Sequence, residues 1–305
     1  MSGKKRQITV ADQELTVSNL DKIFYPATGF TKGDVIDYYL AIAPLMMPHL
    51  VGRPINLRRY PDGVEGESFF QKECPLPGPE GVTISPRYSE YKDDEVNYCV
   101  IQDAAGLVWV ANLASIEVHT YLARASNWER PTQMVFDLDP GEPAGLLDSA
   151  RVALRLREEL AEMDLQGFAK TSGGKGIHLA VPLNTSVTYE QTKEFARALA
   201  GRLADADPEH VVMNMRKDLR EGKVLVDWSQ NEVHKSTVCV YSLRARERPT
   251  VSTPLAWEEL EEAVDQQEAR RVVFEAQEVL KRVERLGDLY KPVLKLQQKL
   301  PKMTD

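Results

Sequence analysis

One apolar run of the chain reads Met134-Val135-Phe136-Asp137-Leu138-Asp139-Pro140 and has the composition of a buried strand. Side chains at i and i+2 of a strand point to the same face, so its two carboxylates lie side by side. Like charges about 4 Å apart repel by roughly 4 kcal/mol at an effective dielectric constant near 20, which favours a bound cation. Carboxylate oxygens prefer Mg²⁺ or Mn²⁺ to softer metals. The alternative is a strand that ends at the surface, with Asp139-Pro140-Gly141 as a turn.

A glycine-rich segment follows further along the chain and reads Thr171-Ser172-Gly173-Gly174-Lys175-Gly176-Ile177-His178. Its glycines let backbone amides approach a polyanion, while Lys175 adds a positive charge and Ser172 a hydroxyl. The spacing differs from that of a P-loop, and the segment leads into a strand instead of a helix. The pattern predicts a phosphate-binding loop. His178 begins the strand, where it can contact a phosphate or satisfy a backbone carbonyl.

A third acidic position closes another apolar run, Val224-Leu225-Val226-Asp227. If Asp227 meets Asp137 and Asp139, the three carboxylates suit a two-metal site for phosphoryl transfer, with ions about 3.5–4 Å apart. Spacing in the sequence does not establish that they meet, and a single aspartate at a strand end is also common in turns.

Taken together and in order, these motifs closely resemble the polymerase domain of bacterial ATP-dependent DNA ligase D, a member of the archaeo-eukaryotic primase superfamily. The resemblance also rests on Tyr241-Ser242-Leu243-Arg244-Ala245-Arg246, Glu117-Val118-His119 and Phe69-Phe70-Gln71-Lys72, and it covers nearly the whole chain. It implies an α+β protein with a two-lobed primase-polymerase fold. The catalytic sheet is expected to be mixed or antiparallel, of RRM-like type, and flanked by helices.

The resemblance also implies an activity and its cofactors. Asp137, Asp139 and Asp227 are the expected catalytic residues and the ligands of two divalent ions, Mn²⁺ or Mg²⁺. The expected reaction is template-dependent nucleotidyl transfer from NTP or dNTP substrates, with a preference for ribonucleotides. It fills short gaps and extends DNA ends in non-homologous end joining or in gap and excision repair. The expected contacts to the nucleotide are His119, Ser172, Lys175, His178, Arg244 and Arg246, of which His119 and Ser172 lie near the ribose 2′-hydroxyl.

By the same resemblance, a second set of residues is expected to bind DNA. Asn19, Lys22 and Lys32 match a pocket for the 5′-phosphate beyond a gap. Phe69 and Phe70 fit a wedge that stacks on template bases, although adjacent aromatic residues are also common in a core. Further contacts to the template or the DNA end are expected from Arg220, Arg53 and Arg59.

Composition restricts the class of protein. The 305 residues are 43% hydrophobic and 28% charged, which is typical of a globular chain without a membrane-spanning segment. A net charge of −8 argues against tight nonspecific wrapping of nucleic acid, so local basic clusters must carry such contacts. No signal peptide is recognised, and three cysteines without a Cys-x-x-Cys pair predict reduced thiols and no structural zinc site. We expect a cytoplasmic, nucleoid-associated protein.

The pattern of helices and strands predicts one catalytic domain over residues 1–290 and a basic C-terminal tail or linker remnant over 291–305. Helices are expected after the capping residues Thr31 and Thr188 and from Leu146 to Met163. Strands are expected at Ile55 to Arg59, Met134 to Asp139, His178 to Pro182, Val224 to Trp228 and Val238 to Tyr241.

Gapped or broken double-stranded DNA with a 5′-phosphate is the expected partner, with Ku and a DNA ligase as further candidates. The chain lacks the nucleotidyl-transfer lysine motif of a ligase and could be a stand-alone enzyme or one domain of a larger protein. Two other functions stay open: a metal-dependent phosphodiesterase or nuclease, and a noncatalytic module that binds 5′-phosphorylated DNA ends.

Overall fold

The computed structural model describes residues 5–90 and 92–301 and divides the chain into two compact units. Unit 1 contains the segment up to Ser126 together with Ser236–Val251 and Glu275–Arg285. Unit 2 contains Asn127–Lys235, Ser252–Phe274 and the segment from Leu286. Helices and mostly antiparallel strands occur in both units, which confirms the expected α+β class.

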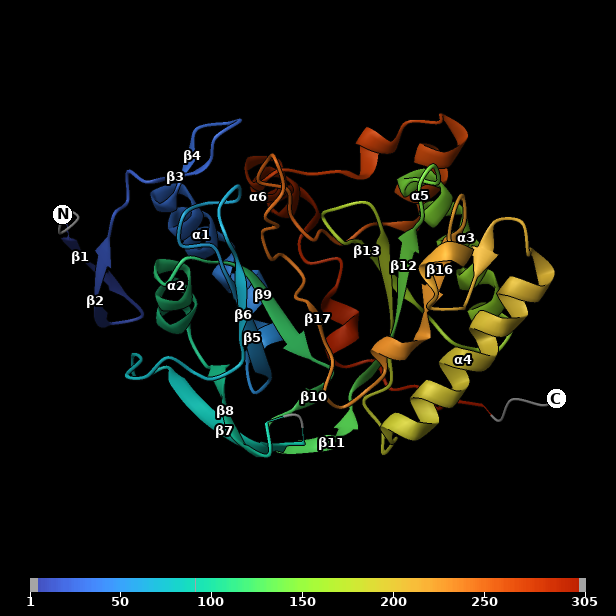
Figure 1. The fold of residues 1–305 in the computed structure, drawn as a ribbon, viewed down its shortest axis with the longest axis horizontal. Coiled ribbons are helices and arrows are strands. Elements are labelled where there is room, and N and C mark those ends of the chain that lie inside the picture. Colours follow the sequence, from blue (N-terminus) through green and yellow to red (C-terminus); the bar gives the residue numbers. More distant parts are fainter. Residues whose placement is uncertain (1–4, 91, 302–305) are drawn as a thin grey trace. The chain divides into compact units, whose positions relative to one another are not determined.

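Unit 2 is built on a five-stranded sheet with the strand order β13-β14-β12-β16-β15 (Figure 1). All neighbouring strands are antiparallel except β15 and β16, so the sheet is mixed, as expected. The strands span β12 (Gln133–Pro140), β13 (Phe168–Thr171), β14 (Ile177–Pro182), β15 (Val211–Val212) and β16 (Val224–Asp227); β11 (Asn127–Pro131) precedes them.

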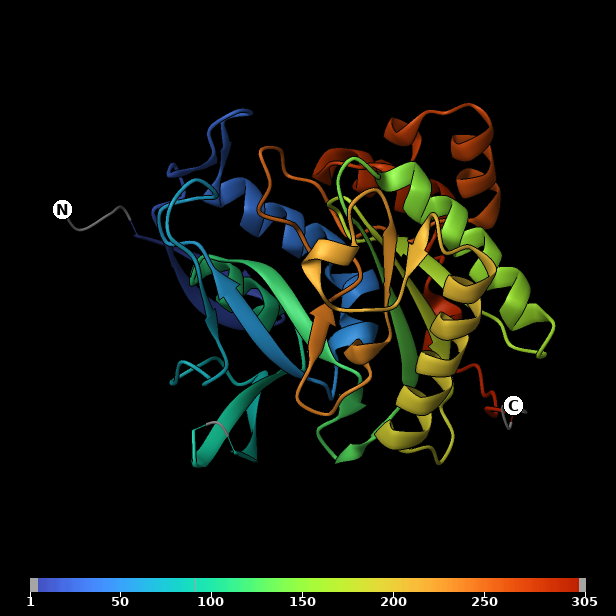
Figure 2. The same ribbon diagram turned by 45° about the vertical axis from the view of Figure 1, so that its right-hand side comes forward.

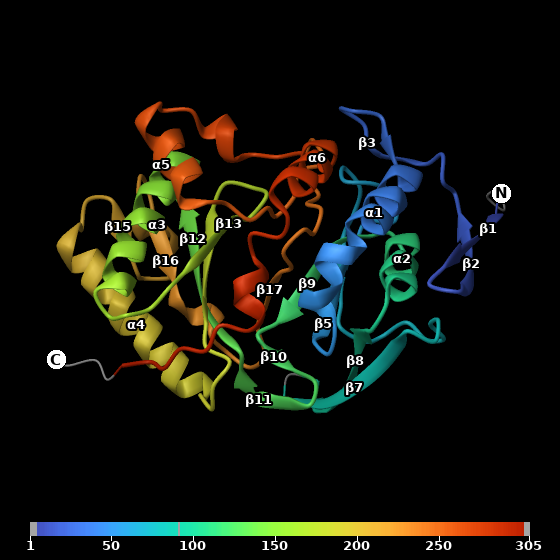
Figure 3. The same ribbon diagram turned by 180° about the vertical axis from the view of Figure 1, so that it is seen from behind.

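Helices α3 (Leu146–Ala161) and α4 (Tyr189–Ala206) cover one face of this sheet (Figures 2 and 3). Met134, Phe136 and Leu138 point to that face and pack against both helices in a fully buried core. Each buried side chain of this size contributes roughly 1.5–3 kcal/mol. Because the side chains of a strand alternate, Asp137 and Asp139 must point to the opposite face.

The predicted caps of two helices are confirmed. In α1 (Lys32–Leu50), Thr31 and Asp34 form a reciprocal capping box, and in α4 Thr188 does so with Gln191. The remaining helices of unit 2 are α5 (Trp257–Asp265) and the short 3₁₀ turns η1 (Lys217–Leu219), η2 (Trp228–Gln230), η3 (Ala269–Val272) and η4 (Lys291–Leu294). Beyond η4, Gln298 hydrogen-bonds to Leu183 and Gln166, which joins this segment to the rest of unit 2.

Unit 1 contains a six-stranded sheet in the order β17-β9-β5-β8-β7, with β6 paired to β5. Helices α1 and α2 (Ala104–Asn112) pack against each other (Figure 3). Tyr38 and Tyr39 of α1 are buried. The strands of the unit are β1 (Lys5–Val10), β2 (Gln13–Ser18), β3 (Ile23–Tyr25), β4 (Phe30–Thr31), β5 (Pro54–Arg59), β6 (Phe69–Gln71), β7 (Val82–Ser89), β8 (Asp94–Ile101), β9 (Ser115–Tyr121), β10 (Ala123–Arg124) and β17 (Ser236–Val238). Almost all of α6 (Ala276–Leu286) also belongs to it.

Two predictions need correction. The strand expected at Val238 to Tyr241 ends at Val238, because Tyr241 has a φ of 65° and turns the chain. Cys74 and Cys99 form a disulfide with their Cα atoms 4.8 Å apart, where reduced thiols were predicted. Their separation of 25 residues has no local signature, and the amide of Cys74 joins the edge of β8 at Asn97. In the described ranges, no helix is long and apolar enough to cross a membrane.

Candidate active site

A row of four polar residues crosses the face of the unit 2 sheet that α3 and α4 leave uncovered. Lys170 of β13 lies directly opposite His178 of β14, which lies opposite Asp137 of β12, which lies opposite Asp227 of β16. Directly opposed residues of neighbouring strands point to the same face. The register therefore brings Asp227 beside Asp137, which the sequence spacing alone did not establish.

A hydrogen bond and an ion-pair contact connect the first three members of this row. The ammonium group of Lys170 lies 3.1 Å from His178 Nδ1 and 2.7 Å from the hydroxyl of Ser252. His178 Nε2 lies 3.2 Å from Asp137 Oδ1. An ammonium group can only donate, so Nδ1 accepts and the proton of the neutral imidazole faces Asp137. Lys170 was not predicted, since only the register of β13 places it next to the histidine.

Asp227 is held by the turn that follows it. Its Oδ1 accepts from the backbone amide of Ser229 at 2.8 Å and from the Ser229 hydroxyl at 2.6 Å, and its Oδ2 accepts from Gln230 at 3.0 Å. Lys235 donates to the same hydroxyl, which directs the hydroxyl proton towards the carboxylate. Asp139 is more exposed and faces Arg220, whose guanidinium is 3.9 Å away.

The chemistry of these donors fits hard divalent cations, because carboxylate oxygens are the ligands that Mg²⁺ and Mn²⁺ prefer. Three carboxylates lie on one face of two adjacent strands. In the part of the chain that the structure describes, no three His, Cys, Asp or Glu side chains are already arranged as a metal site. The oxygens of Asp227 accept hydrogen bonds from Ser229 and Gln230, and the carboxylate of Asp139 faces Arg220. Because a carboxylate has about four lone-pair sites, lone pairs remain for a cation.

The glycine-rich loop lies between β13 and β14 and is closed by its own serine. The Ser172 hydroxyl accepts from the amides of Gly174 and Gly176 at 3.2 and 3.3 Å. Gly173 has a φ of 71°, and a Cβ on Gly176 would lie 2.4 Å from the Leu138 carbonyl oxygen, so both positions require glycine. Lys175 is exposed and pairs with Glu142. A phosphate entering the loop would compete with these contacts.

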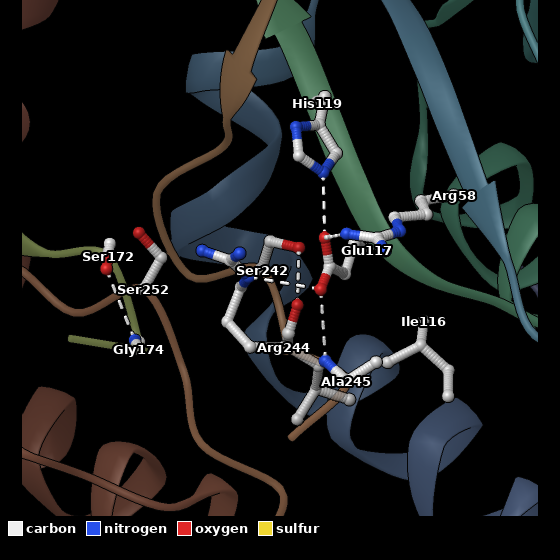
Figure 4. Close-up of polar contacts among 12 residues, drawn as sticks. Arg58, Ile116, Glu117, His119, Ser172, Gly174, Ser242, Arg244, Ala245 and Ser252 are labelled. Atoms are coloured by element: carbon white, nitrogen blue, oxygen red, sulfur yellow. Dashed lines mark hydrogen bonds and ion pairs between the residues drawn. The ribbon is translucent and has the colours of Figure 1, made fainter. Parts of the chain in front are cut away.

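A buried carboxylate organises the predicted nucleotide contacts of unit 1 (Figure 4). Glu117 of β9 is 1% exposed, and its Oε2 lies 2.9 Å from His119 Nε2. Its Oε1 accepts from the Ala245 amide at 3.1 Å and forms an ion pair with Arg244 Nε at 3.2 Å. Burial alone would raise the pKa of Glu117, but the hydrogen bond from His119 and the charge of Arg244 outweigh burial and lower the pKa strongly. The carboxylate is therefore ionised.

The residues expected to bind a 5′-phosphate lie around the start of α1. Lys32 is 5% exposed and donates to the Ser18 carbonyl and to Asn112 Oδ1, both at 2.8 Å. Burial, followed by the charges of Lys22 and Arg59, lowers the pKa of Lys32 to about 8. Lys22 pairs with Asp62 at 2.7 Å. Asn19 has a φ of 57°, and its carbonyl accepts from the Lys22 amide, which sets the turn between them.

Two exposed aromatic side chains project from the short strand β6. Phe69 and Phe70 are 46% and 55% exposed, so they are not core residues. The guanidinium of Arg59 lies 5.4 Å from the centre of the Phe69 ring, and that of Arg58 lies 5.2 Å from the Phe70 ring. These cation–π contacts restrict the motion of both rings. Arg59 also donates to Leu113 and Gln71, which ties β6 to the sheet.

The arginines expected to contact DNA differ in their surroundings. Arg53 is 5% exposed, and its guanidinium donates to the Leu122 carbonyl at 2.7 Å, while its expected contact with DNA stays a prediction. Arg220 is anchored on the Met215 carbonyl beside Asp139, and its Nε has no hydrogen-bond partner among the described residues. Arg246 is exposed in the loop that follows Arg244.

Comparisons with known proteins show the family of this chain. The family model of the LigD primase-polymerase domain matches residues 31–290. The multifunctional non-homologous end joining protein LigD of Mycolicibacterium smegmatis is 40% identical over 283 residues, covering 92% of this chain and 36% of the relative. The LigD protein of Pseudomonas aeruginosa is 37% identical over 265 residues, or 85% of this chain and 30% of the relative. The chain thus spans about a third of the length of these relatives.

A solved structure supports the same assignment. The polymerase domain from Mycobacterium tuberculosis Ligase D in complex with DNA matches with a TM-score of 0.86 and 39% identity. The match covers 92% of this chain and 98% of that one. Because the family model and the relatives cover most of its length, this chain belongs to the LigD primase-polymerase domain family.

Proposed function

We propose that this chain is a template-dependent nucleotidyltransferase that fills short gaps and extends DNA ends, with a preference for ribonucleotides. The observation that carries the proposal is the row of Lys170, His178, Asp137 and Asp227 on the face of the unit 2 sheet opposite α3 and α4. The relatives are named for non-homologous end joining, and the similar solved domain is in complex with DNA. Repair of broken or gapped duplex DNA by end joining or gap filling is the role that fits both.

Asp137, Asp139 and Asp227 would hold two divalent ions, Mn²⁺ or Mg²⁺. When bound, these ions neutralise the charge on the transferred phosphoryl group and activate the primer 3′-hydroxyl. The protein supplies positioning: His178 and the Ser229 turn orient the carboxylates of Asp137 and Asp227. Because nucleotidyl transfer of this kind needs little protein acid–base chemistry, this orientation is the main contribution of the chain.

The other predicted residues bind the substrates. Lys175 would leave Glu142 to contact the triphosphate, together with Ser172, His178, Arg244 and Arg246. His119 and Ser172 would contact the ribose 2′-hydroxyl. Lys22, Lys32 and Asn19 would hold the 5′-phosphate, because clustered cations bind a terminal dianion better than an internal phosphodiester. Phe69 and Phe70 would stack on template bases beside Arg59, with Arg220 near the DNA end.

The cellular setting belongs to the same proposal. Residues 1–290 would act as one catalytic domain, and residues 291–305 would be a basic tail or linker remnant. Ku and a DNA ligase are the proposed partners, and the cytoplasm, on the nucleoid, is the proposed location. The similarity to parts of much longer end-joining proteins supports this setting.

The test is extension of a labelled primer on gapped duplex DNA with Mn²⁺, comparing ribonucleotides with deoxyribonucleotides and a 5′-phosphorylated downstream strand with a hydroxylated one. We expect templated addition that favours ribonucleotides and the phosphate. Asp137→Ala should lower extension by at least about a hundredfold, since it removes transition-state charge stabilisation, while binding of gapped DNA persists. Asp205→Ala on the exposed side of α4 is the matched control.

Three outcomes separate the proposal from its alternatives. Shortening of the primer would identify a nuclease. An unchanged primer with binding that depends on the phosphate would identify a noncatalytic end-binding module. Equal loss of DNA binding and extension in Asp137→Ala would remove the assignment of that residue to catalysis.

A further inference from the structure

The carboxylate of Glu117 can only accept hydrogen bonds, and this determines the state of His119. The low pKa of Glu117 keeps it ionised, and an ionised carboxylate has no proton to donate. The 2.9 Å contact between Glu117 Oε2 and His119 Nε2 therefore requires a proton on Nε2. In a neutral imidazole the other nitrogen, Nδ1, must then carry a lone pair.

The imidazole of His119 is neutral near pH 7. Its burial lowers the pKa below the usual 6.5, and the charges of Arg244 and Arg58 lower it further, while Glu117 raises it. These are the charged groups that face the ring, from β9, from β5 and from the loop after β17. The net effect is a lowered pKa, so His119 has one proton to place and Glu117 determines where it lies.

The ring is also fixed in orientation. The edge of Phe70 packs on it with ring centres 5.3 Å apart at an interplanar angle of 73°. Its side chain is 12% exposed. Figure 4 shows Nε2 turned to Glu117 and the second nitrogen turned away from it. Among the described residues, no hydrogen bond to Nδ1 is present, so this nitrogen is an available acceptor held in a defined place.

We propose that Glu117 is a positioning residue for sugar selection, because it holds His119 in the tautomer whose Nδ1 accepts a hydrogen bond from a hydroxyl group of the nucleotide. The inference rests on the proposed function, in which that hydroxyl is the ribose 2′-hydroxyl. A sugar that offers a hydrogen-bond donor satisfies the nitrogen, and a sugar without one leaves it unpaired on binding. A 2′-fluorine, which can only accept, faces a lone pair and is disfavoured further.

The substitution Glu117→Gln should reverse the tautomer of His119. Oε1 accepts a hydrogen bond from the amide of Ala245 and lies 3.2 Å from the positively charged Arg244 Nε, so the carboxamide oxygen must occupy this position. Its NH₂ group then faces His119 Nε2 and requires a lone pair there. The proton moves to Nδ1, and the imidazole presents a donor where the wild-type protein presents an acceptor.

The first measurement is the two-bond ¹H–¹⁵N correlation spectrum of the histidine side chains, at pH 7.5, for the wild-type chain and for Glu117→Gln. The chain has five histidines, and the signals of His119 are identified by their disappearance in His119→Gln. We expect an Nε2–H tautomer in the wild type and an Nδ1–H tautomer in the variant. An Nδ1–H tautomer in the wild type would overturn the proposal, whether or not the variant folds.

The second measurement is kcat/KM for incorporation of nucleotides that carry 2′-hydroxyl, 2′-hydrogen or 2′-fluorine. We expect Glu117→Gln to lower the preference for hydroxyl over fluorine by about tenfold, which corresponds to one exchanged hydrogen bond. Glu95→Gln, an exposed residue of β8, should leave the preference unchanged. A switched tautomer with an unchanged preference would overturn the role in sugar selection.

The two proposals fail in different ways. If the wild-type chain incorporates no nucleotide, the proposed function fails, while the spectrum still reports whether Glu117 sets the tautomer. If the wild-type chain extends primers and both the tautomer and the preference are the same in Glu117→Gln, the proposed function stands and the role of Glu117 is refuted.

Discussion

Lys32 is a buried lysine whose ammonium group uses only part of its hydrogen-bonding capacity within the fold. Its ammonium group has three donors, and two of them reach Ser18 and Asn112. The third has no partner among the described residues. Burial and the nearby charges of Lys22 and Arg59 disfavour its charged form. An anion that binds here would supply both the missing acceptor and the missing negative charge.

This arrangement predicts a proton-linked binding of the 5′-phosphate. The pKa of Lys32 in the free protein is about 8, below its usual 10.5, so above pH 8 the group is mostly neutral. A phosphate dianion stabilises the charged form, so binding takes up a proton at pH 8–9 and weakens as the pH rises through 8. Titration calorimetry in two buffers of different ionisation enthalpy measures this uptake, and Lys32→Met should abolish it.

The control compares DNA with a 5′-phosphate and DNA with a 5′-hydroxyl. Uptake should occur only with the phosphate. The same pKa also acts on stability: because it is lowered in the folded state, the charged lysine costs stability below pH 8, and this cost disappears between pH 8 and 10.5. Equal proton uptake with both ends would show that another group is responsible.

At the scale of elements, the end of β16 is completed by a side chain. Pairing between β12 and β16 stops at Asp137 and Asp227, so the backbone of Val135 has no partner strand there. The side chain of Asn231 takes the place of a partner strand. The Oδ1 of Asn231 accepts from the Val135 amide at 2.9 Å, and its Nδ2 donates to the Val135 carbonyl at 2.8 Å. The carboxamide thereby anchors the turn that holds Asp227.

Asn231→Ala should therefore destabilise unit 2 and misplace Asp227. The substitution leaves a buried amide and a buried carbonyl without partners, and we expect a loss of about 2–4 kcal/mol in the free energy of unfolding. Urea denaturation measures the loss, and Asn127→Ala on the exposed part of β11 is the matched control. A change below about 0.5 kcal/mol would mean that water replaces the carboxamide at no cost.

For the whole molecule, charge limits how DNA can be bound. The chain carries 38 basic and 46 acidic residues, so nonspecific attraction to a duplex is weak and contacts must come from local clusters. Lys22, Lys32 and Arg59 form one such cluster, in which the charges of Lys22 and Arg59 disfavour the charged form of Lys32. Binding that depends on a terminal phosphate is the expected result of a small, concentrated positive site on a negative protein.

The salt dependence of DNA binding checks this view. A few phosphate contacts predict a shallow slope of log K against log salt concentration, and Lys22→Gln should reduce that slope by about 1 for 5′-phosphorylated gapped DNA. Lys281→Gln, on an exposed position of α6, is the matched control. A steep slope that neither substitution alters would place most of the contacts elsewhere on the protein.

Short-range patterns in the sequence were sufficient for several parts of the site. The alternation of a strand put Asp137 and Asp139 on one face, and the capping residues Thr31 and Thr188 marked the starts of α1 and α4. These features depend on backbone geometry over two to four residues, so they can be read from one segment at a time. The order of the motifs then indicated the family and, with it, the α+β fold.

Other features depend on which distant segments meet. The register of four strands placed Lys170 beside His178 and Asp227 beside Asp137. Packing in unit 1 placed Glu117 next to Arg244, which is 127 residues further along the chain. The same long-range packing joined Cys74 to Cys99 and buried Arg53. The sequence by itself determined which chemical groups are present and how neighbours along the chain are oriented. Only the tertiary structure decided which groups are partners, because pairing across strands depends on contacts that no local pattern contains.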